Sequence, residues 1–167
     1  MSAKGTRATE VVRRAAIPHT LHAYAAEPAT GRDRSVRPRF GRDAAEALDV
    51  APERIFKTLV AAVDGRLAVA IVPVAGELDL KRLADALGGH RAEMAEPAAA
   101  ERATGYVIGG ISPLGLRRAL PSVLDESATS FPTIFVSAGR RGLQVELAPA
   151  DLVDLIGARV AAIARGP

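Results

Sequence analysis

Two long apolar runs joined by a tight-turn signal place the strongest constraint on the fold of this 167-residue chain. Residues 55–63 (IFKTLVAAV) and 67–74 (LAVAIVPV) are rich in apolar and β-branched residues, and Asp64-Gly65 lies between them. An Asp-Gly pair between two such runs is typical of a β-hairpin, because both residues readily adopt the turn conformation. The sequence therefore predicts two adjacent antiparallel strands in the middle of the chain.

Capping and breaking residues predict short elements on both sides of this hairpin. Helices are expected at 7–16 (capped by Thr6, ended by Pro18), 43–48, 80–87 (capped by Asp79), 97–104 and 149–156. Strands are expected at 20–24, 91–94, 123–124, 133–137 and 143–147, and residues 159–164 form a last strand or helix.

These six to eight strands and four to six short helices predict an α+β fold. The hairpins are antiparallel, which disfavours a doubly wound parallel sheet. We expect a mixed, largely antiparallel sheet, curled or closed into a barrel, with the helices outside. The chain has no linker long enough to divide it, so residues 1–167 are expected to form one domain with a core over about 6–164.

Composition excludes several classes of protein. Apolar residues are 49% and charged residues 25%, as in ordinary globular domains. The chain has no cysteine, which excludes disulfides, cysteine-ligated metals and a cysteine nucleophile. No apolar run reaches the roughly 18–20 residues that span a bilayer, and no apolar core follows the first five residues. We therefore expect a cytoplasmic protein without a membrane segment. The three histidines are scattered, so neither a metal nor another cofactor is expected.

Lys57 lies inside the first long apolar run. Alternation along a strand places it on one face with Leu59 and Ala61, and Phe56 and Thr58 on the other. Both faces are mostly apolar, so the strand is expected to be covered on both sides. A lysine there can lie at an edge and reach solvent or an ion-pair partner, or it can lie on the floor of a pocket. In a pocket it would bind a phosphate or carboxylate, or polarise a carbonyl.

Residues 109–115 (GGISPLG) contain three glycines, a proline and a serine, and cannot form a regular element. Glycines allow the backbone to approach a ligand and to turn amides toward it, so this segment could hold an oxyanion or a carbonyl oxygen. It is neither a Walker A loop nor a GxGxxG fingerprint. As a bare pattern, the segment is more typical of a plain structural turn.

Two segments concentrate arginine. The segment over 27–42 is loop-like, and from residue 32 onward it carries five arginines against one aspartate. Such a segment is either a solvated loop or a contact to an anionic partner such as nucleic acid. Residues 137–142 (SAGRRG) form either an ordinary hairpin turn or a basic turn over a site. The candidate RNA-contacting residues are Arg32, Arg34, Arg37, Arg39 and Arg141.

Taken together, the segments FKTL at 56–59, TGYVIGGISPLG at 104–115 and RGL at 141–143 resemble the YbaK/EbsC family. These are bacterial Cys-tRNA(Pro) deacylases, related to the editing domain of prolyl-tRNA synthetase. The resemblance runs in order from about residue 6 to residue 163. It implies a barrel-like mixed sheet flanked by helices, and an activity that removes a wrong amino acid from tRNA by breaking the aminoacyl ester. It implies mischarged tRNA as partner, tRNA(Pro) above all, and an association with prolyl-tRNA synthetase.

The resemblance also implies roles for individual residues. Lys57 would be the residue on which activity most depends, and the amides of Gly109 and Gly110 would lie near the ester carbonyl. The residues expected to bind the substrate are Tyr24, Thr58, Ile111, Ser112, Pro113, Leu114 and Ser137.

No protein nucleophile is then required, since the thiol of the substrate is proposed to attack its own ester in family members that clear cysteine. Attack by water is the alternative, and both routes would use the same lysine and loop.

This chain departs from the family pattern in two places. The segment between Tyr24 and Phe40 is longer and more basic than in common members, and Gln144 stands where many carry an acidic residue. The second departure leaves alanine, serine and threonine open as the amino acids removed. A non-catalytic module that binds an aminoacyl or nucleotide group is the alternative from a different class. A general RNA-binding protein is disfavoured because the whole chain has only six phenylalanines and tyrosines, too few aromatic side chains for stacking on bases.

Overall fold

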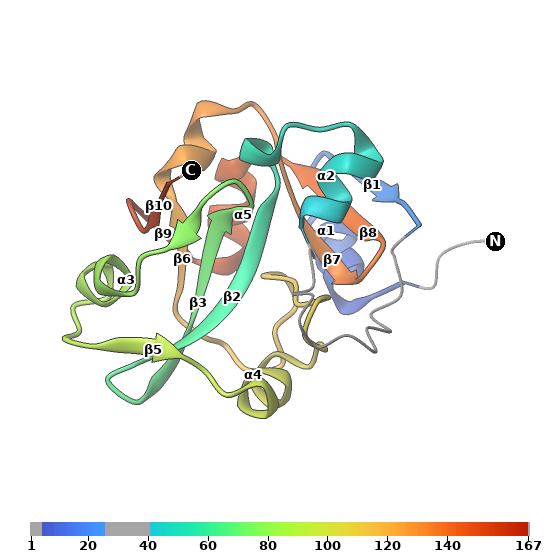
Figure 1. Cartoon of the computed structure of the whole chain (residues 1–167). Helices are drawn as coiled ribbons and strands as arrows, with labels where there is room; N and C mark the ends of the chain where they lie inside the picture. The colour runs from blue at the N-terminus through green and yellow to red at the C-terminus, as the bar shows by residue number, and fades with distance from the viewer. Residues whose placement is uncertain (1–4, 26–40, 167) are drawn as a thin grey trace, which may run out of the picture.

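The computed structural model describes residues 5–25 and 41–166, and Figure 1 shows their arrangement. The helices are α1 (Arg7–Ala15), α2 (Arg42–Leu48), α3 (Leu80–Ala86), α4 (Pro97–Thr104) and α5 (Pro149–Ile156), with 3₁₀ turns η1 (Pro52–Arg54) and η2 (Glu126–Ser130). The strands are β1 (His19–Ala23), β2 (Phe56–Val63), β3 (Arg66–Pro73), β4 (Glu77–Leu78), β5 (Ala92–Met94), β6 (Ser122–Asp125), β7 (Ile134–Arg140), β8 (Leu143–Leu147), β9 (Arg159–Ala161) and β10 (Ala164–Arg165).

The predicted hairpin is confirmed and forms the centre of a five-stranded sheet. β2 and β3 pair antiparallel over their full lengths, and the positive φ angles of Asp64 and Gly65 close the turn. The strand order is β5-β2-β3-β6-β9. β6 lies parallel to both β3 and β9, since each of these connections is a crossover that contains a helix.

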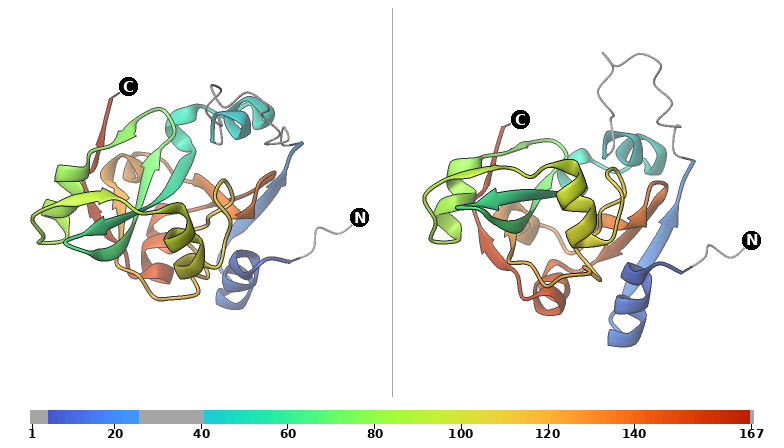
Figure 2. Two further views of the ribbon diagram at one scale, coloured as in Figure 1. Left: turned by 60° about the horizontal axis from the view of Figure 1, so that its bottom comes forward. Right: turned by 90° about the horizontal axis from the view of Figure 1, so that it is seen from below.

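A second sheet, of order β1-β8-β7, is antiparallel throughout, and a two-stranded sheet joins β4 to β10. The two larger sheets meet where Ile55, just before β2, forms an isolated parallel bridge with Phe135 of β7. The sheets are curved toward one another (Figure 2), but the strand pairing does not close into a complete barrel in the part of the chain that is described.

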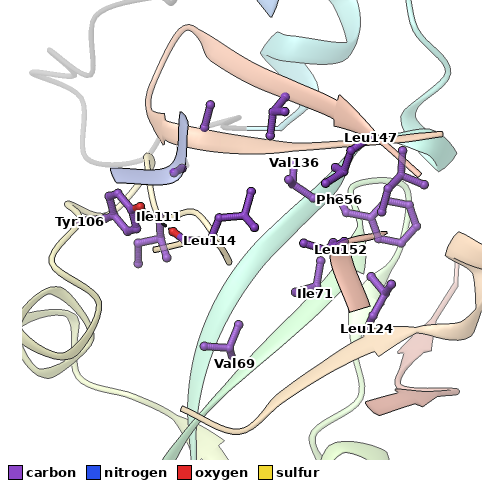
Figure 3. Close-up of a cluster of buried hydrophobic side chains, with 14 of the residues drawn as sticks. Phe56, Val69, Ile71, Tyr106, Ile111, Leu114, Leu124, Val136, Leu147 and Leu152 are labelled. Carbon is purple, nitrogen blue, oxygen red and sulfur yellow. Dashed lines mark hydrogen bonds between the residues drawn. The ribbon is translucent and has the colours of Figure 1, made fainter. Parts of the chain in front are cut away.

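The side chains of β2 alternate between two buried clusters, as the apolar pattern on both faces predicts. Phe56 and Val60 pack into the larger cluster, which lies between the two sheets (Figure 3). Ala61 and Val63 pack on the other face, against a cluster that includes Leu83 of α3. Burial on both faces makes β2 a rigid support for any functional side chain that it carries.

The mixed α+β class is confirmed, and every helix and strand expected from the sequence is present. Their bounds agree within one or two residues except at β7, which continues to Arg140, three residues beyond the expected end. The ten strands of the described residues exceed the expected six to eight. The additional ones are β4 and a division of the last segment into β9 and β10, each only two or three residues long. Such short strands have no periodicity of their own, because they form only when distant segments pair. In the described residues, no helix is long and apolar enough to cross a bilayer.

Candidate active site

A cleft of about 1060 Å³ opens beside the outer edge of β2. β5 pairs with this edge only over Ala61–Val63, so residues 57–59 have no strand neighbour on that side within the described residues. The second sheet, α2 and residues 109–115, referred to below as the glycine segment, supply other walls of the cleft. The residues that line the cleft come from several elements and include Tyr24, Arg42, Thr58, Glu77, Gly109, Ile111, Ser137, Arg141 and Gln144.

Lys57 lines this cleft from β2 and is half-buried. Its ammonium has neither a hydrogen bond nor an ion pair within the described residues. Burial lowers the pKa of Lys57, Glu77 acts in the opposite direction, and Arg42 lowers the pKa further. Lys57 is thus a cation without a close partner on the wall of the cleft, which suits it to bind an anionic or strongly polar group of a ligand.

The glycine segment reaches the same cleft through a tight turn. The Gly110 amide donates to the Val107 carbonyl at 2.9 Å, and the Ile108 amide donates to Glu101 Oε2 at 2.8 Å. Gly109 lies at the tip of the turn with φ of 94°, a value that favours glycine. Its amide has no acceptor among the described residues, so this N–H is available to a ligand.

Gly110 has a packing role that the sequence did not indicate. A Cβ at this position would lie 2.9 Å from Arg140 Cα, so only glycine allows the turn to lie backbone against backbone on the end of β7. With its amide engaged by Val107, Gly110 has no free donor for an oxyanion. Of the two expected amides, the structure leaves the one of Gly109 open.

The rest of the glycine segment is anchored in the core. The Tyr106 hydroxyl donates to the Leu114 carbonyl at 2.6 Å, and the Leu114 amide donates to Ser112 Oγ at 3.2 Å. Figure 3 shows the Tyr106 ring beside Ile111 and Leu114. These contacts fix the direction in which Gly109 points.

Two buried polar atoms of the cleft lack partners. Thr58 Oγ1 and Gln144 Oε1 form no hydrogen bond, and they are the only such side-chain atoms in the described residues. Gln144 lies on β8 directly opposite Ser137 of β7 and His22 of β1, so all three share the face of the second sheet that looks toward α2. Since an unpaired buried polar atom is costly, these two mark positions in the cleft where a ligand or an ordered water can supply the missing hydrogen bonds.

Comparison with known proteins identifies the family of this chain. The family model for the aminoacyl-tRNA editing domain matches residues 41–155. A protein of Enterococcus faecalis, provisionally named Cys-tRNA(Pro)/Cys-tRNA(Cys) deacylase EbsC, is 44% identical over 121 residues, which are 71% of this chain and 73% of that protein. The chain belongs to the aminoacyl-tRNA editing domain family.

Two further relatives of this editing domain have names connected with proline. The proline–tRNA ligase of Moorella thermoacetica is 37% identical over 70 residues, which are 42% of this chain and 12% of the ligase. A crystal structure described as a provisionally assigned trans-editing enzyme for prolyl tRNA synthetase superposes with a TM-score of 0.80 and 25% identity, over 99% of both chains. The expectation of an aminoacyl-tRNA editing enzyme is thereby confirmed.

The expected site residues of the editing domain fall into three groups. Lining the cleft are Lys57, Gly109, Tyr24, Thr58, Ile111, Ser137 and Arg141. Buried behind its wall are Gly110, Ser112, Pro113 and Leu114. Outside the described residues are Arg32, Arg34, Arg37 and Arg39. For the second group, substrate contact stays a prediction, and the structure shows packing and hydrogen bonding within the loop.

Sequence reasoning missed the charged residues that face Lys57. Arg42 and Glu77 belong to α2 and β4, and the fold alone brings them to the cleft. Asp43 lies 3.9 Å from Arg141 and joins α2 to the β7–β8 turn. No spacing in the sequence links these positions. Groups of three or more residues able to hold a metal ion are absent from the part of the chain that is described.

Proposed function

We propose that this editing domain is a trans-acting deacylase that clears Cys-tRNA(Pro), with residues 1–167 acting as one domain. The observation that carries the proposal is the convergence of Lys57, the open amide of Gly109 and the unpartnered Thr58 and Gln144 on one cleft. The name of the Enterococcus relative, at 44% identity, supports cysteine as the amino acid and tRNA(Pro) as its carrier. Such an enzyme would work in the cytoplasm, where tRNA is charged, and the relation to proline–tRNA ligase favours an association with that synthetase.

In this proposal Lys57 binds the 3′-terminal nucleotide of the tRNA through its phosphate or ribose oxygens and holds the ester in place. The Gly109 amide donates to the ester carbonyl oxygen and stabilises the negative charge that develops on it. Thr58, Ser137 and Gln144 surround the small aminoacyl group.

For cysteine, the substrate thiol attacks its own carbonyl carbon. A C–S bond forms, the ester C–O bond breaks, and the thiol proton passes to the ribose oxygen, which releases a cyclic thiolactone. Water in place of the thiol gives free amino acid by the same geometry, and that is the route for alanine or serine.

A deacylation assay tests this function. Cys-, Ala- and Ser-tRNA(Pro) are incubated with the wild type, with Lys57→Ala and with the matched control Lys81→Ala. Lys81 is an exposed lysine of α3 that pairs with Asp85 outside the cleft. We expect Lys57→Ala to lose about 100-fold or more in kcat/KM, since the ester would no longer be held in position for the reaction. Lys81→Ala should keep wild-type activity.

Ester loss at the rate without protein, in the wild type as well as the variant, would exclude the enzyme. In that case retained binding of aminoacyl-tRNA would favour a non-catalytic module. Comparing Cys-tRNA(Pro) with a tRNA carrying 2-aminobutyrate, which has a methyl group in place of the thiol, separates the two routes. Cyclisation predicts turnover of the cysteinyl ester alone.

A further inference from the structure

Five exposed arginines gather around the outer side of the glycine segment. They belong to α1, α4, the loop that follows Gly115, and the end of β7. Their side chains form neither hydrogen bonds nor ion pairs within the described residues. We refer to Arg7, Arg102, Arg117, Arg118 and Arg140 as the arginine surface.

Several close contacts hold these segments together. A Cβ at Gly105 would meet both the Arg7 guanidinium and Arg117 Cβ, which places those two arginines side by side. The Arg117 and Arg118 amides donate to the last carbonyls of α4, at Thr104 and Ala103.

Arg140 joins the same surface from the second sheet. The Thr6 hydroxyl, one residue before Arg7, donates to the carbonyl of Ala138 at 2.5 Å. Figure 2 shows α1 beside the β7–β8 hairpin and the glycine segment. The backbone positions of these arginines therefore follow from the packing of α1, α4 and β7.

The arginine surface borders the cleft directly. Ile108 and Gly109 line the cleft, and the next residue, Gly110, lies against the Arg140 backbone. Arg141 follows Arg140 and also lines the cleft. A ligand that enters the cleft past Gly109 would therefore leave its remaining part outside the cleft, next to the arginine surface.

Most other arginines of the described chain have acidic neighbours. Arg13 and Arg14 pair with Glu10, Arg82 with Asp79, and Arg165 with Glu77. Neighbouring arginines without such acidic partners repel one another, and an anionic partner relieves that repulsion. The regular phosphate spacing of an RNA helix offers charges to several of these groups at once.

We propose that the arginine surface binds the phosphate backbone of the tRNA acceptor stem while the 3′ end lies in the cleft. The proposal rests on the proposed function and adds the direction from which the tRNA approaches, across α1 and the 115–118 loop. It is separate from the basic segment before residue 42, which lies outside the described residues.

Binding of uncharged tRNA at several salt concentrations tests this surface. The double variant Arg117→Gln/Arg140→Gln removes two of its charges. The matched control Arg66→Gln/Arg91→Gln removes two exposed arginines beside the β2–β3 turn, so the net charge changes equally. In the surface variant, the slope of log K against log salt should become shallower by about 1.8, since each lost phosphate contact accounts for about 0.9. The control should keep the wild-type slope and affinity, and identical slopes for the two variants would overturn the proposal.

A kinetic comparison separates this proposal from the proposed function. The surface variant should raise KM for aminoacyl-tRNA and leave kcat/KM unchanged for an aminoacylated CCA trinucleotide, which is too short to reach the surface. Equal losses on both substrates would place these arginines in the cleft chemistry and contradict a role in binding the stem. If the wild type cleaves neither ester, the proposed function fails. The salt dependence of tRNA binding then still shows whether the arginine surface binds tRNA.

Discussion

At the scale of single residues, the cleft is notable for polar groups that the fold leaves without partners. Lys57, Thr58 and Gln144 each lack the interaction that would stabilise it in the free protein. A buried polar atom without a hydrogen-bond partner costs about 1–3 kcal/mol, so Thr58 and Gln144 lower the stability of the fold. A ligand that supplies the missing partners recovers this free energy on binding.

Thr58→Val tests this relation between stability and function. Valine has nearly the same shape and suits a strand, but it removes the unpartnered hydroxyl. We expect the free energy of unfolding to rise by up to about 1 kcal/mol, because the unsatisfied buried hydroxyl at position 58 is removed. We also expect kcat/KM for the aminoacyl ester to fall. Urea denaturation and the deacylation assay measure the two effects.

The control for this prediction is Thr129→Val, which removes an exposed hydroxyl that donates to the Glu126 carbonyl at 2.7 Å. It should not raise stability and should not alter activity. A Thr58→Val protein that is less stable than the wild type and fully active would show that the hydroxyl has a structural partner and no part in catalysis.

The sequence identified some of these residues better than others. Lys57 could be predicted because a lysine inside an apolar strand breaks a local pattern. Gln144 was noted only as a departure from a family motif, and its missing partner became visible when β8 was placed between β1 and β7. Gly110 was predicted to act through its amide, whereas its contact with Arg140 depends on a turn thirty residues away.

At the scale of elements, the short pairings at the chain's end depend on Asp125. Its Oδ1 accepts hydrogen bonds from the Ile163 and Ala164 amides at 2.9 Å each, and its Oδ2 accepts from Ser127. These bonds hold β10 beside β4, where Glu77 and Arg165 line the cleft. A two-residue strand has too little pairing to be stable alone, which explains why neither strand could be predicted from its sequence.

The pH dependence of stability should reflect this carboxylate. Burial acts to raise the pKa of Asp125, but the hydrogen bonds from Ser127, Ile163 and Ala164 outweigh it and lower the pKa. A carboxyl group with a lowered pKa in the folded state stabilises the fold fully above its ordinary value of about 4. This stabilisation is lost as the pH falls through the lowered value.

Asp125→Asn should therefore lose roughly 2 kcal/mol at neutral pH, because hydrogen bonds to a charged acceptor are replaced by weaker or missing ones. The variant should also depend less on pH than the wild type below about pH 4. Urea denaturation between pH 7 and pH 2 checks both effects. Parallel curves for the two proteins, with no loss at neutral pH, would contradict the role of the carboxylate.

At the scale of the whole molecule, the cleft lies between two sheets that share little backbone pairing. β2 belongs to one sheet, and Ser137, Arg141 and Gln144 belong to the other. The single bridge between Ile55 and Phe135 joins them in the described residues. The distance between the two walls of the cleft therefore depends on side chains at this junction. The hairpin could be predicted from local patterns, but this junction could not, because it joins residues eighty positions apart.

Arg54 is the side chain that connects the two sheets. Its guanidinium donates to the Thr133 carbonyl at 3.0 and 3.3 Å and to Thr133 Oγ1 at 2.7 Å. It also lies 3.6 Å from Glu146 and 5.3 Å from the centre of the Phe135 ring. Glu146 in turn binds His22 of β1 at 2.9 Å. A planar group with several donors can make these contacts together, and an ammonium group cannot.

Arg54→Lys should keep the positive charge and lose the hydrogen bonds that join the two sheets. We expect the free energy of unfolding to fall by about 1–2 kcal/mol, since one or two hydrogen bonds are lost. We also expect kcat/KM for the ester to fall although Arg54 does not line the cleft, because the wall that carries Gln144 is no longer held against β2. Arg66→Lys, at an exposed position beside the hairpin turn, should change neither quantity. A less stable Arg54→Lys protein with wild-type turnover, measured where both proteins are fully folded, would show that the junction stabilises the fold without setting the width of the cleft.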